Sequence, residues 1–300
     1  MGRRRRGRAI NGWLNIDKPQ GLTSTQVVGR VRRLTEARKI GHGGTLDPLA
    51  TGVLPVALGE ATKAIPYVMD ASKVYEFVIR WGVATDTDDA EGAVIETVAE
   101  RPTPEQVAAV LPAFTGEIEQ VPPAYSAVRV GGARAYDLAR QGETVELKPR
   151  RVVIDQLQIV NDPSLEPDET ALRMLCGKGT YVRSLARDLG RELGTLGHVT
   201  RLRRCRVGPF DEATAISLDK LEELVHSAPP EQTVLPVETA LDDIPAVALT
   251  EGEASRLKQG QTVHVPQRRE GMVRAMADDV LIAVCELMDG RLKPLRVFNL

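Results

Sequence analysis

The chain has 300 residues, of which 42% are hydrophobic and 27% charged, a balance typical of a globular protein with a packed core. No apolar run approaches the roughly 20 residues that a membrane-spanning helix needs, which argues against a membrane protein. The net charge is only −2, and the three cysteines lack the spacing of a zinc site or a disulfide framework, so we expect a cytoplasmic protein without a metal.

Apolar periodicity and turn residues predict the elements of the chain. Alternating polarity indicates strands, an apolar stripe at helical spacing indicates amphipathic helices, and Gly and Pro mark the breaks between them. The predicted strands and buried apolar runs are residues 13–16, 52–59, 74–81, 151–160 and 171–176. The predicted helices begin at Thr23 or Ser24 and at Thr103, and two further helices are residues 133–141 and 181–194.

These elements follow no regular strand–helix–strand rhythm, which indicates an α+β fold with a mixed, largely antiparallel sheet. An acidic stretch over residues 211–243 is predicted to form a helix and then a linker, and short strands separated by glycines follow it. We therefore expect a disordered basic tail, a large domain, a linker and a small β-rich C-terminal domain, over residues 1–10, 11–228, 229–245 and 246–300.

Basic residues are concentrated in two segments. Residues 1–60 carry 11 Lys or Arg against 4 Asp or Glu, and residues 173–206 carry 9 against 2, whereas residues 211–255 carry 1 against 11. Such segments are typical of a surface that binds a polyanion, but solvated helix faces would produce the same counts. Charge alone leaves both interpretations open.

One carboxylate, Asp47, stands in a segment from Gly41 to Gly52 that is rich in Gly and Pro. Such a loop lets the backbone approach a ligand closely, and a partly desolvated Asp there can act as a nucleophile or a base. The alternative is an Asp before Pro in an ordinary turn, and physical reasoning alone favours that alternative.

A second segment, residues 177–183, joins two glycines, a lysine, Tyr181 and Arg183 at the start of a helix. This arrangement can accept a phosphate or pair with a carboxylate, and a structural Arg on a helix face is the alternative. The acidic run at 86–91 lacks the spacing of a calcium loop and predicts a solvated turn. The sequence contains no P-loop and no G-x-S-x-G motif, and its histidines are not spaced as metal ligands.

The segment GHGGTLDPLATGVLPVALGEATK resembles the catalytic motif of the TruB family of tRNA pseudouridine(55) synthases. Five more segments resemble further motifs of this family. They follow in the expected order and cover most of residues 11–210: GWLNIDKPQGLTS, KVYEF, VPPAYSAVRVGGARAYDLAR, GKGTYVRSLARDLG and HVTRLRRCRVGPF. Residues 249–300 resemble a PUA domain, a small β-rich module that binds RNA; the alternative is a β-rich cap that touches no RNA. Dyskerin-type relatives share several motifs and work in guide-RNA particles, but nothing in this sequence suggests the partner surfaces that they need.

The resemblance implies the pseudouridine synthase fold and a role for each matching residue. Asp47 matches the catalytic carboxylate, Tyr75 the tyrosine that stacks on the target base, and Arg183 the arginine that pairs with the catalytic carboxylate. His42, Tyr181 and Leu202 match family positions that contact RNA or the flipped nucleotide. Lys18 and Pro19 match an N-terminal motif that supports the active site.

The implied activity is the isomerisation of uridine 55 in the TΨC loop of tRNA to pseudouridine, by base flipping and by cleavage and re-formation of the glycosidic bond. It implies the T-arm stem-loop of tRNA as partner, no cofactor, no membrane, no obligatory protein partner and a monomer. Two alternatives are a non-catalytic tRNA-folding chaperone and a nucleoside glycosidase. The intact Asp47 motif favours catalysis over the chaperone, and the basic segments favour RNA over a free nucleoside.

Overall fold

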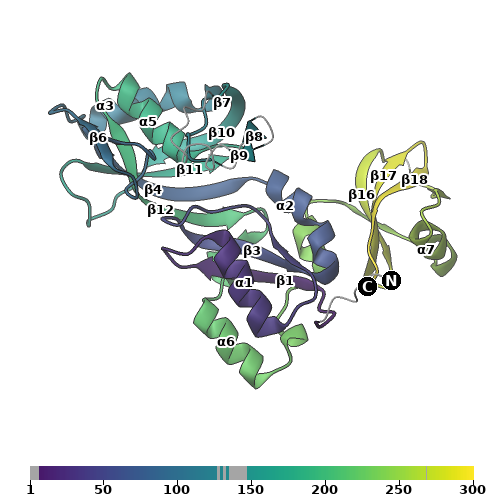
Figure 1. Ribbon diagram of the computed structural model, residues 1–300. Helices are drawn as coiled ribbons and strands as arrows, with labels where there is room; N and C mark the ends of the chain where they lie inside the picture. The colour runs from purple at the N-terminus through teal and green to yellow at the C-terminus, as the bar shows by residue number, and fades with distance from the viewer. Residues whose placement is uncertain (1–6, 127–128, 131–132, 135–146, 268) are drawn as a thin grey trace.

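The computed structural model describes residues 7–126, 129–130, 133–134, 147–267 and 269–300. They form a large N-terminal part built on one sheet and a small C-terminal part with a sheet of its own (Figure 1). The helix predicted at 133–141 falls outside the described residues, apart from Ala133 and Arg134, which belong to a short strand.

The large part is organised around a sheet that has nine strands among the described residues. Its main path runs β1-β3-β12-β4-β11-β10-β7, with β2 paired to β3 and β13 paired to β12. Neighbouring strands are antiparallel except β3 and β12, which are parallel. The fold class predicted from the sequence is therefore confirmed. The strands are β1 (Gly12–Lys18), β2 (Ile40–His42), β3 (Thr51–Leu58), β4 (Lys73–Trp81), β7 (Gly116–Gln120), β10 (Arg150–Ile159), β11 (Glu169–Cys176), β12 (Gly197–Val207) and β13 (Phe210–Asp211).

Figure 1 shows helices α3 and α5 beside one half of this sheet and α1 and α6 beside the other. Helix α1 begins where the sequence predicts, because the Thr23 hydroxyl and the Gln26 side chain form a capping box. The helices of the large part are α1 (Ser24–Thr35), α2 (Ile65–Asp70), α3 (Pro104–Val110), α5 (Val182–Glu192) and α6 (Leu218–Ser227). Its short elements are β5 (Val83–Thr85), β6 (Val94–Thr97), β8 (Arg129–Val130), β9 (Ala133–Arg134) and the 3-10 helices η1 (Gly59–Lys63), η2 (Leu111–Phe114), η3 (Glu212–Thr214), η4 (Pro230–Gln232) and η5 (Val237–Leu241).

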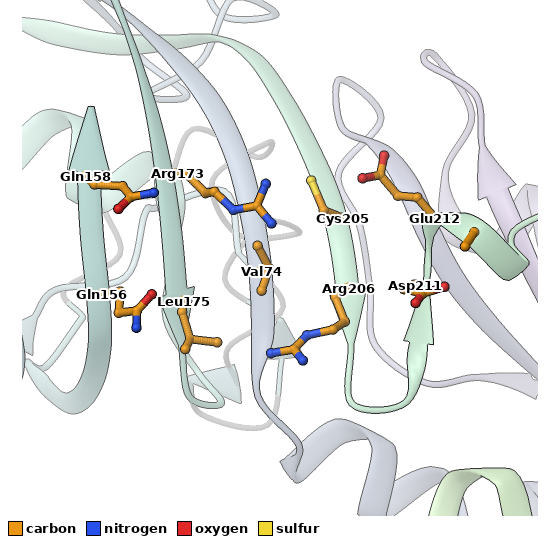
Figure 2. Close-up of a pocket in the computed structure, with 10 residues that line it drawn as sticks. Val74, Gln156, Gln158, Arg173, Leu175, Cys205, Arg206, Asp211 and Glu212 are labelled. Carbon is orange, nitrogen blue, oxygen red and sulfur yellow. The ribbon is translucent and has the colours of Figure 1, made fainter. Parts of the chain in front are cut away.

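The two faces of the central sheet differ because successive side chains of a strand point in opposite directions. The inner face, which carries Phe77, Ile79 and Trp81 of β4, packs into the main core with the apolar side of α5. The outer face mixes charged and polar side chains with apolar ones such as Val74 and Leu175. Figure 2 shows part of it, a hollow of about 520 Å³ lined by strands β10, β11, β4 and β12, with Arg173 and Arg206 among its side chains.

The predicted tail and linker both differ from the structure. Arg8 forms an ion pair with Glu231 at 2.7 Å, and Ile10 is buried, so the packed chain begins before residue 10. The segment 229–245 contains η4 and η5, and Val237 and Leu241 of η5 are buried. Apolar side chains in a segment rich in proline and acid account for this difference, because they bind it to the large part.

The C-terminal part is a five-stranded sheet, in the order β14-β16-β17-β18-β15, with one helix packed on it. Two of its residues, Val284 and Phe298, share an apolar cluster with Val68 of α2 and Trp13 of β1. The Lys63 side chain also donates a hydrogen bond to the carbonyl of Val297 at 2.8 Å, so the contact is polar as well as apolar. The elements are β14 (Ala246–Ala248), α7 (Glu251–Lys258), β15 (Val263–His264), β16 (Gly271–Ala277), β17 (Val280–Met288) and β18 (Arg291–Val297).

Candidate active site

Asp47 lies in the loop that connects β2 to β3, and its side chain is 37% exposed. The loop is anchored on α1, because the Ser24 hydroxyl accepts a hydrogen bond from the Leu46 N–H at 2.8 Å and donates one to the Leu46 carbonyl at 3.1 Å. Leu46 and Leu49, on either side of Asp47, are buried in the main core. The carboxylate is therefore held at an accessible position by a fixed backbone.

Lys18, at the end of β1, supports the same loop from inside the protein. Its side chain is fully buried, and its ammonium donates hydrogen bonds to three carbonyls, those of Pro19 at 2.9 Å, Pro48 at 3.2 Å and Ala50 at 2.6 Å. Burial lowers the pKa of Lys18 to about 8, and the carboxylates of Glu91 and Asp47 oppose that change. The Pro19 ring is exposed, so its contribution to the loop is the carbonyl that Lys18 binds.

Arg183, in the first turn of α5, pairs with Asp47, with 2.9 Å between its Nη2 and the Asp47 Oδ2. The Arg183 side chain is only 6% exposed, so a largely desolvated cation meets a carboxylate that solvent reaches. Its remaining partners are the carbonyls of Thr87 and Tyr125, at 2.9 and 2.8 Å, and the carboxylate of Asp89 at 3.6 Å. These acceptors hold the Arg183 guanidinium in one orientation, in which it faces the Asp47 carboxylate.

Tyr75 lies on β4 and packs against the main core from the inner face of the sheet. Burial raises the pKa of the Tyr75 phenol, and the positive charge of Arg204 opposes that rise. Tyr75 is paired directly with Arg204 across β4 and β12.

The three residues expected to contact RNA lie on three elements. His42 ends β2, and its Nδ1 accepts a hydrogen bond from the Gly44 N–H at 3.4 Å; burial and the charge of Arg204 lower the pKa of His42. Tyr181 precedes α5, and burial raises the pKa of its phenol, with Asp47 also contributing. Leu202 of β12 is nearly buried, and its carbonyl accepts a hydrogen bond from the Thr51 hydroxyl at 3.4 Å. The structure thus connects His42, Tyr181 and Leu202 to the Asp47 loop or its surroundings.

The acidic run at 86–91 was expected to be a solvated turn, and the structure corrects this for two residues. Asp89 is buried beside Arg183, and Asp88 lies 3.1 Å from Arg187, one turn further along α5. Arg183 and Arg187 are spaced at i and i+4, so they share one face of the helix. That spacing is the feature of the sequence that indicates two acidic partners for this face. Their charges fix this turn onto the start of α5.

Two further buried polar residues near the site did not stand out in the sequence. Gln120 of β7 accepts a hydrogen bond from the Tyr181 N–H at 2.7 Å and donates one to the Tyr181 carbonyl at 3.0 Å. Arg204 of β12 donates one hydrogen bond to the carbonyl of Gly44 in the Asp47 loop and another to the carbonyl of Val53 in β3. No local motif marks either residue, because their partners are distant backbone groups that only the fold brings near.

Within the described ranges, no group of three or more His, Cys, Asp or Glu side chains is arranged to hold a metal ion. In the same part of the chain, no helix is long and apolar enough to cross a membrane. The basic segment at 173–206 is partly neutralised, since Arg201 pairs with Asp162 at 3.0 Å and Arg203 with Asp17 at 3.0 Å.

Comparisons with known proteins assign this chain to a family. Residues 32–182 match the model of the TruB family pseudouridylate synthase N-terminal domain, and residues 183–242 and 245–298 match two models of TruB C-terminal domains. The chain is 55% identical to tRNA pseudouridine synthase B of Rhodospirillum rubrum and 54% identical to that of Caulobacter vibrioides, each over the full length of both chains.

Solved structures agree with this assignment. A chain in an H/ACA RNP bound to a substrate RNA containing 2′-deoxyuridine has a TM-score of 0.75 and 25% identity, covering 96% of this chain and 85% of that one. A chain in a Cbf5-Nop10-Gar1 complex has a TM-score of 0.74 and 26% identity, with the same coverage. The chain therefore belongs to the TruB family of pseudouridylate synthases.

Proposed function

We propose that this protein converts uridine 55 in the TΨC loop of tRNA to pseudouridine, with Asp47 as the catalytic carboxylate. The observation that carries the proposal is the ion pair between the accessible Asp47 carboxylate and the buried Arg183, at 2.9 Å, at the centre of the matched family motifs. A cation at this distance favours the charged form of a carboxylate. The relatives named tRNA pseudouridine synthase B, similar over their full length, support tRNA as the substrate.

The reaction is an isomerisation of one nucleotide. The bond from the ribose C1′ to N1 of uracil breaks, the base turns, and a bond from C1′ to C5 forms; C5 loses a proton and N1 gains one. No electrons enter or leave, so the chemistry requires no redox cofactor. Asp47 acts at the ribose or the base as the glycosidic bond breaks, because a positioned carboxylate can serve as nucleophile or proton acceptor.

Tyr75 and the neighbouring residues hold the base while it turns. Extruding a nucleotide from an RNA loop costs a few kcal/mol, and stacking on an aromatic ring returns about 1–3 kcal/mol. We assign the ring of Tyr75 to that stacking and its hydroxyl to proton transfer. His42, Tyr181 and Leu202 complete the pocket, and Lys18 with Pro19 supports the loop beneath it.

The T-arm stem-loop is the part of tRNA that we expect the site to recognise, because proteins read RNA loops through their shape and splayed bases. We further propose a cytoplasmic monomer that needs no partner protein. The three cysteines are buried and free, which suits a reducing compartment. Residues 246–300 are proposed to add RNA contacts as a PUA-like domain.

The test is product mapping on an unmodified tRNA transcript incubated with the purified protein. We expect pseudouridine at position 55 and at no other uridine, with the RNA chain intact. Release of free uracil would instead identify a glycosidase, and altered tRNA folding without pseudouridine would identify a chaperone. Either of these two results contradicts the proposal.

A further inference from the structure

Arg204 is a buried arginine whose described partners are all neutral. Its side chain is 1% exposed and lies on β12, one strand away from the Asp47 loop. It donates hydrogen bonds to three backbone carbonyls, those of Val53 at 2.8 Å, Gly44 at 3.1 Å and Thr45 at 3.4 Å. In the described part of the chain, no carboxylate lies within the 4.0 Å of an ion pair with this guanidinium.

The three carbonyls lie on both sides of Asp47. Gly44 and Thr45 precede it in the loop, and Val53 follows it in β3, so one side chain of β12 binds both the loop and the strand that comes after it. Lys18 holds the middle of the loop through the carbonyls of Pro48 and Ala50. The position of the Asp47 backbone is therefore set by two buried cations.

Arg204 also lies beside Tyr75. The two residues are paired directly across the antiparallel strands β12 and β4. Directly paired residues have their side chains on the same face of the sheet, with Cβ atoms about 4.5–5.5 Å apart. One side chain thus binds the loop that carries Asp47 and neighbours Tyr75.

An apolar side chain at this position would leave the three carbonyls without this donor, and an unsatisfied polar group out of solvent is costly. The guanidinium also places a positive charge beside the Tyr75 phenol, and such a charge favours negative charge on the oxygen.

We propose that Arg204 is a positioning residue for pseudouridine formation. It fixes the Asp47 loop relative to Tyr75, which is its partner across the two strands. This inference rests on the proposed function, because it acts through the roles assigned to Asp47 and Tyr75.

The test compares Arg204→Met and Arg204→Lys with the wild-type full-length chain, using single-turnover rates on a tRNA transcript at saturating protein. Arg206→Met is the matched control, since Arg206 is an exposed residue two positions along the same strand, on the outer face (Figure 2). Thermal melts identify a temperature at which every variant is folded, and tRNA affinity is measured separately.

We expect Arg204→Met to lower the rate by about a hundredfold or more while the Kd for tRNA changes less than about threefold. Arg204→Lys should be intermediate, because an ammonium keeps the charge but cannot span three acceptors. Arg206→Met should stay within about twofold of wild type for both quantities. A loss confined to affinity would point to a general electrostatic role and overturn the inference.

A rate for Arg204→Met within about threefold of wild type would also overturn it. If the Met variant does not fold, the Lys variant decides: a wild-type rate for it contradicts the inference, and a reduced rate at unchanged affinity supports it. Failure of the proposed function is separate, because it appears as a wild-type protein that forms no pseudouridine at all.

Discussion

At the scale of single residues, the site is an accessible carboxylate among buried, oriented cations. Arg183 pairs with Asp47, Lys18 supports its loop, and both side chains are almost entirely out of solvent. Buried donors of this kind do not reorganise when charge develops in a reaction, and such preorganisation is a main source of catalytic power.

Substitution of Tyr75 separates its ring from its hydroxyl. Tyr75→Phe keeps the stacking face and removes only the hydroxyl that we assign to proton transfer, so we expect near-normal tRNA binding with very slow turnover. Tyr75→Leu removes the aromatic face, so its rate at saturating tRNA should also fall, and by more than its affinity does, because the loss falls on the flipped state. Single-turnover rates and filter-binding affinities measure both effects. A wild-type rate for the Leu variant would remove Tyr75 from the site and leave it as a core residue.

Lys18 makes stability depend on pH in a specific direction. Its folded-state pKa is lowered to about 8 from 10.5, so between these values the unfolded chain binds more protons than the folded one. Stability should therefore rise with pH across this window, by up to about 1.4 kcal/mol per pH unit for one group. Denaturant unfolding of wild type and Lys18→Met isolates the effect, because Lys73 and other groups titrate in both. Parallel pH curves for the two proteins would contradict it.

At the scale of elements, the sequence predicts those strands and helices whose side chains keep a regular apolar pattern. Strand β4 alternates and α1 carries a complete capping box, and both were located within a few residues. Strand β12 was missed because Arg201, Arg203 and Arg206 interrupt its apolar residues, and the segment resembles a basic surface. Two of these arginines, Arg201 and Arg203, form ion pairs with Asp162 and Asp17, partners that only the fold brings near.

The residues of the candidate site also fall into those that the sequence predicts and those that it does not. Asp47, Tyr75 and Arg183 belong to recognisable motifs, and the structure pairs Asp47 with Arg183 at 2.9 Å. Arg204 could not be found from local sequence, because its acceptors are backbone carbonyls about 150 residues away along the chain, at Val53 and Gly44. The same is true of Gln120, which binds the backbone of Tyr181 from a neighbouring strand.

The close contact between strands β3 and β12 can be tested by a substitution at Gly52. Gly52 has φ +96°, and a Cβ there would lie 2.3 Å from the carbonyl oxygen of Arg204. Gly52→Ala should therefore force the two strands apart and lower stability by more than about 3 kcal/mol, with loss of activity. Gly21→Ala is the control, since Gly21 has φ +82° with nothing within 4 Å of the added carbon, and strain alone costs about 1–2 kcal/mol. Equal unfolding free energies for the two variants would show that the strands do not touch as described.

At the scale of the whole molecule, the two sheets are joined by a shared apolar cluster and by hydrogen bonds. Phe298 and Val284 pack with Val68 and Trp13, and the Asn299 N–H donates to the Glu60 carboxylate at 2.7 Å. Lys63 binds the same Glu60 carboxylate at 2.6 Å. The Glu60 carboxylate therefore links two residues of η1 and also contacts the backbone after β18. The C-terminal sheet is thus held next to α2 and the edge of the large part.

The proposed reaction needs only groups that the chain itself supplies. A pre-folded T-arm hairpin should therefore be modified in excess EDTA at a rate close to that measured with magnesium, because the proposed isomerisation assigns every step to side chains of the protein. Rates on the hairpin and on full-length tRNA, each with and without EDTA, measure this directly. Activity on the hairpin that disappears with EDTA and returns with one specific metal would contradict the account. Activity restricted to full-length tRNA would instead show that the C-terminal part or the tRNA elbow is required.

The central claim is that Asp47 carries out pseudouridine formation at position 55, and the most direct measurement maps that position in tRNA treated in parallel with wild type and Asp47→Asn. The Asn side chain keeps the size of the original and removes the negative charge that Arg183 faces. We predict full conversion by the wild type and none by the variant, with tRNA affinities that differ by less than about tenfold, or 1.4 kcal/mol. Conversion by a clean preparation of Asp47→Asn within about tenfold of the wild-type rate would contradict the account.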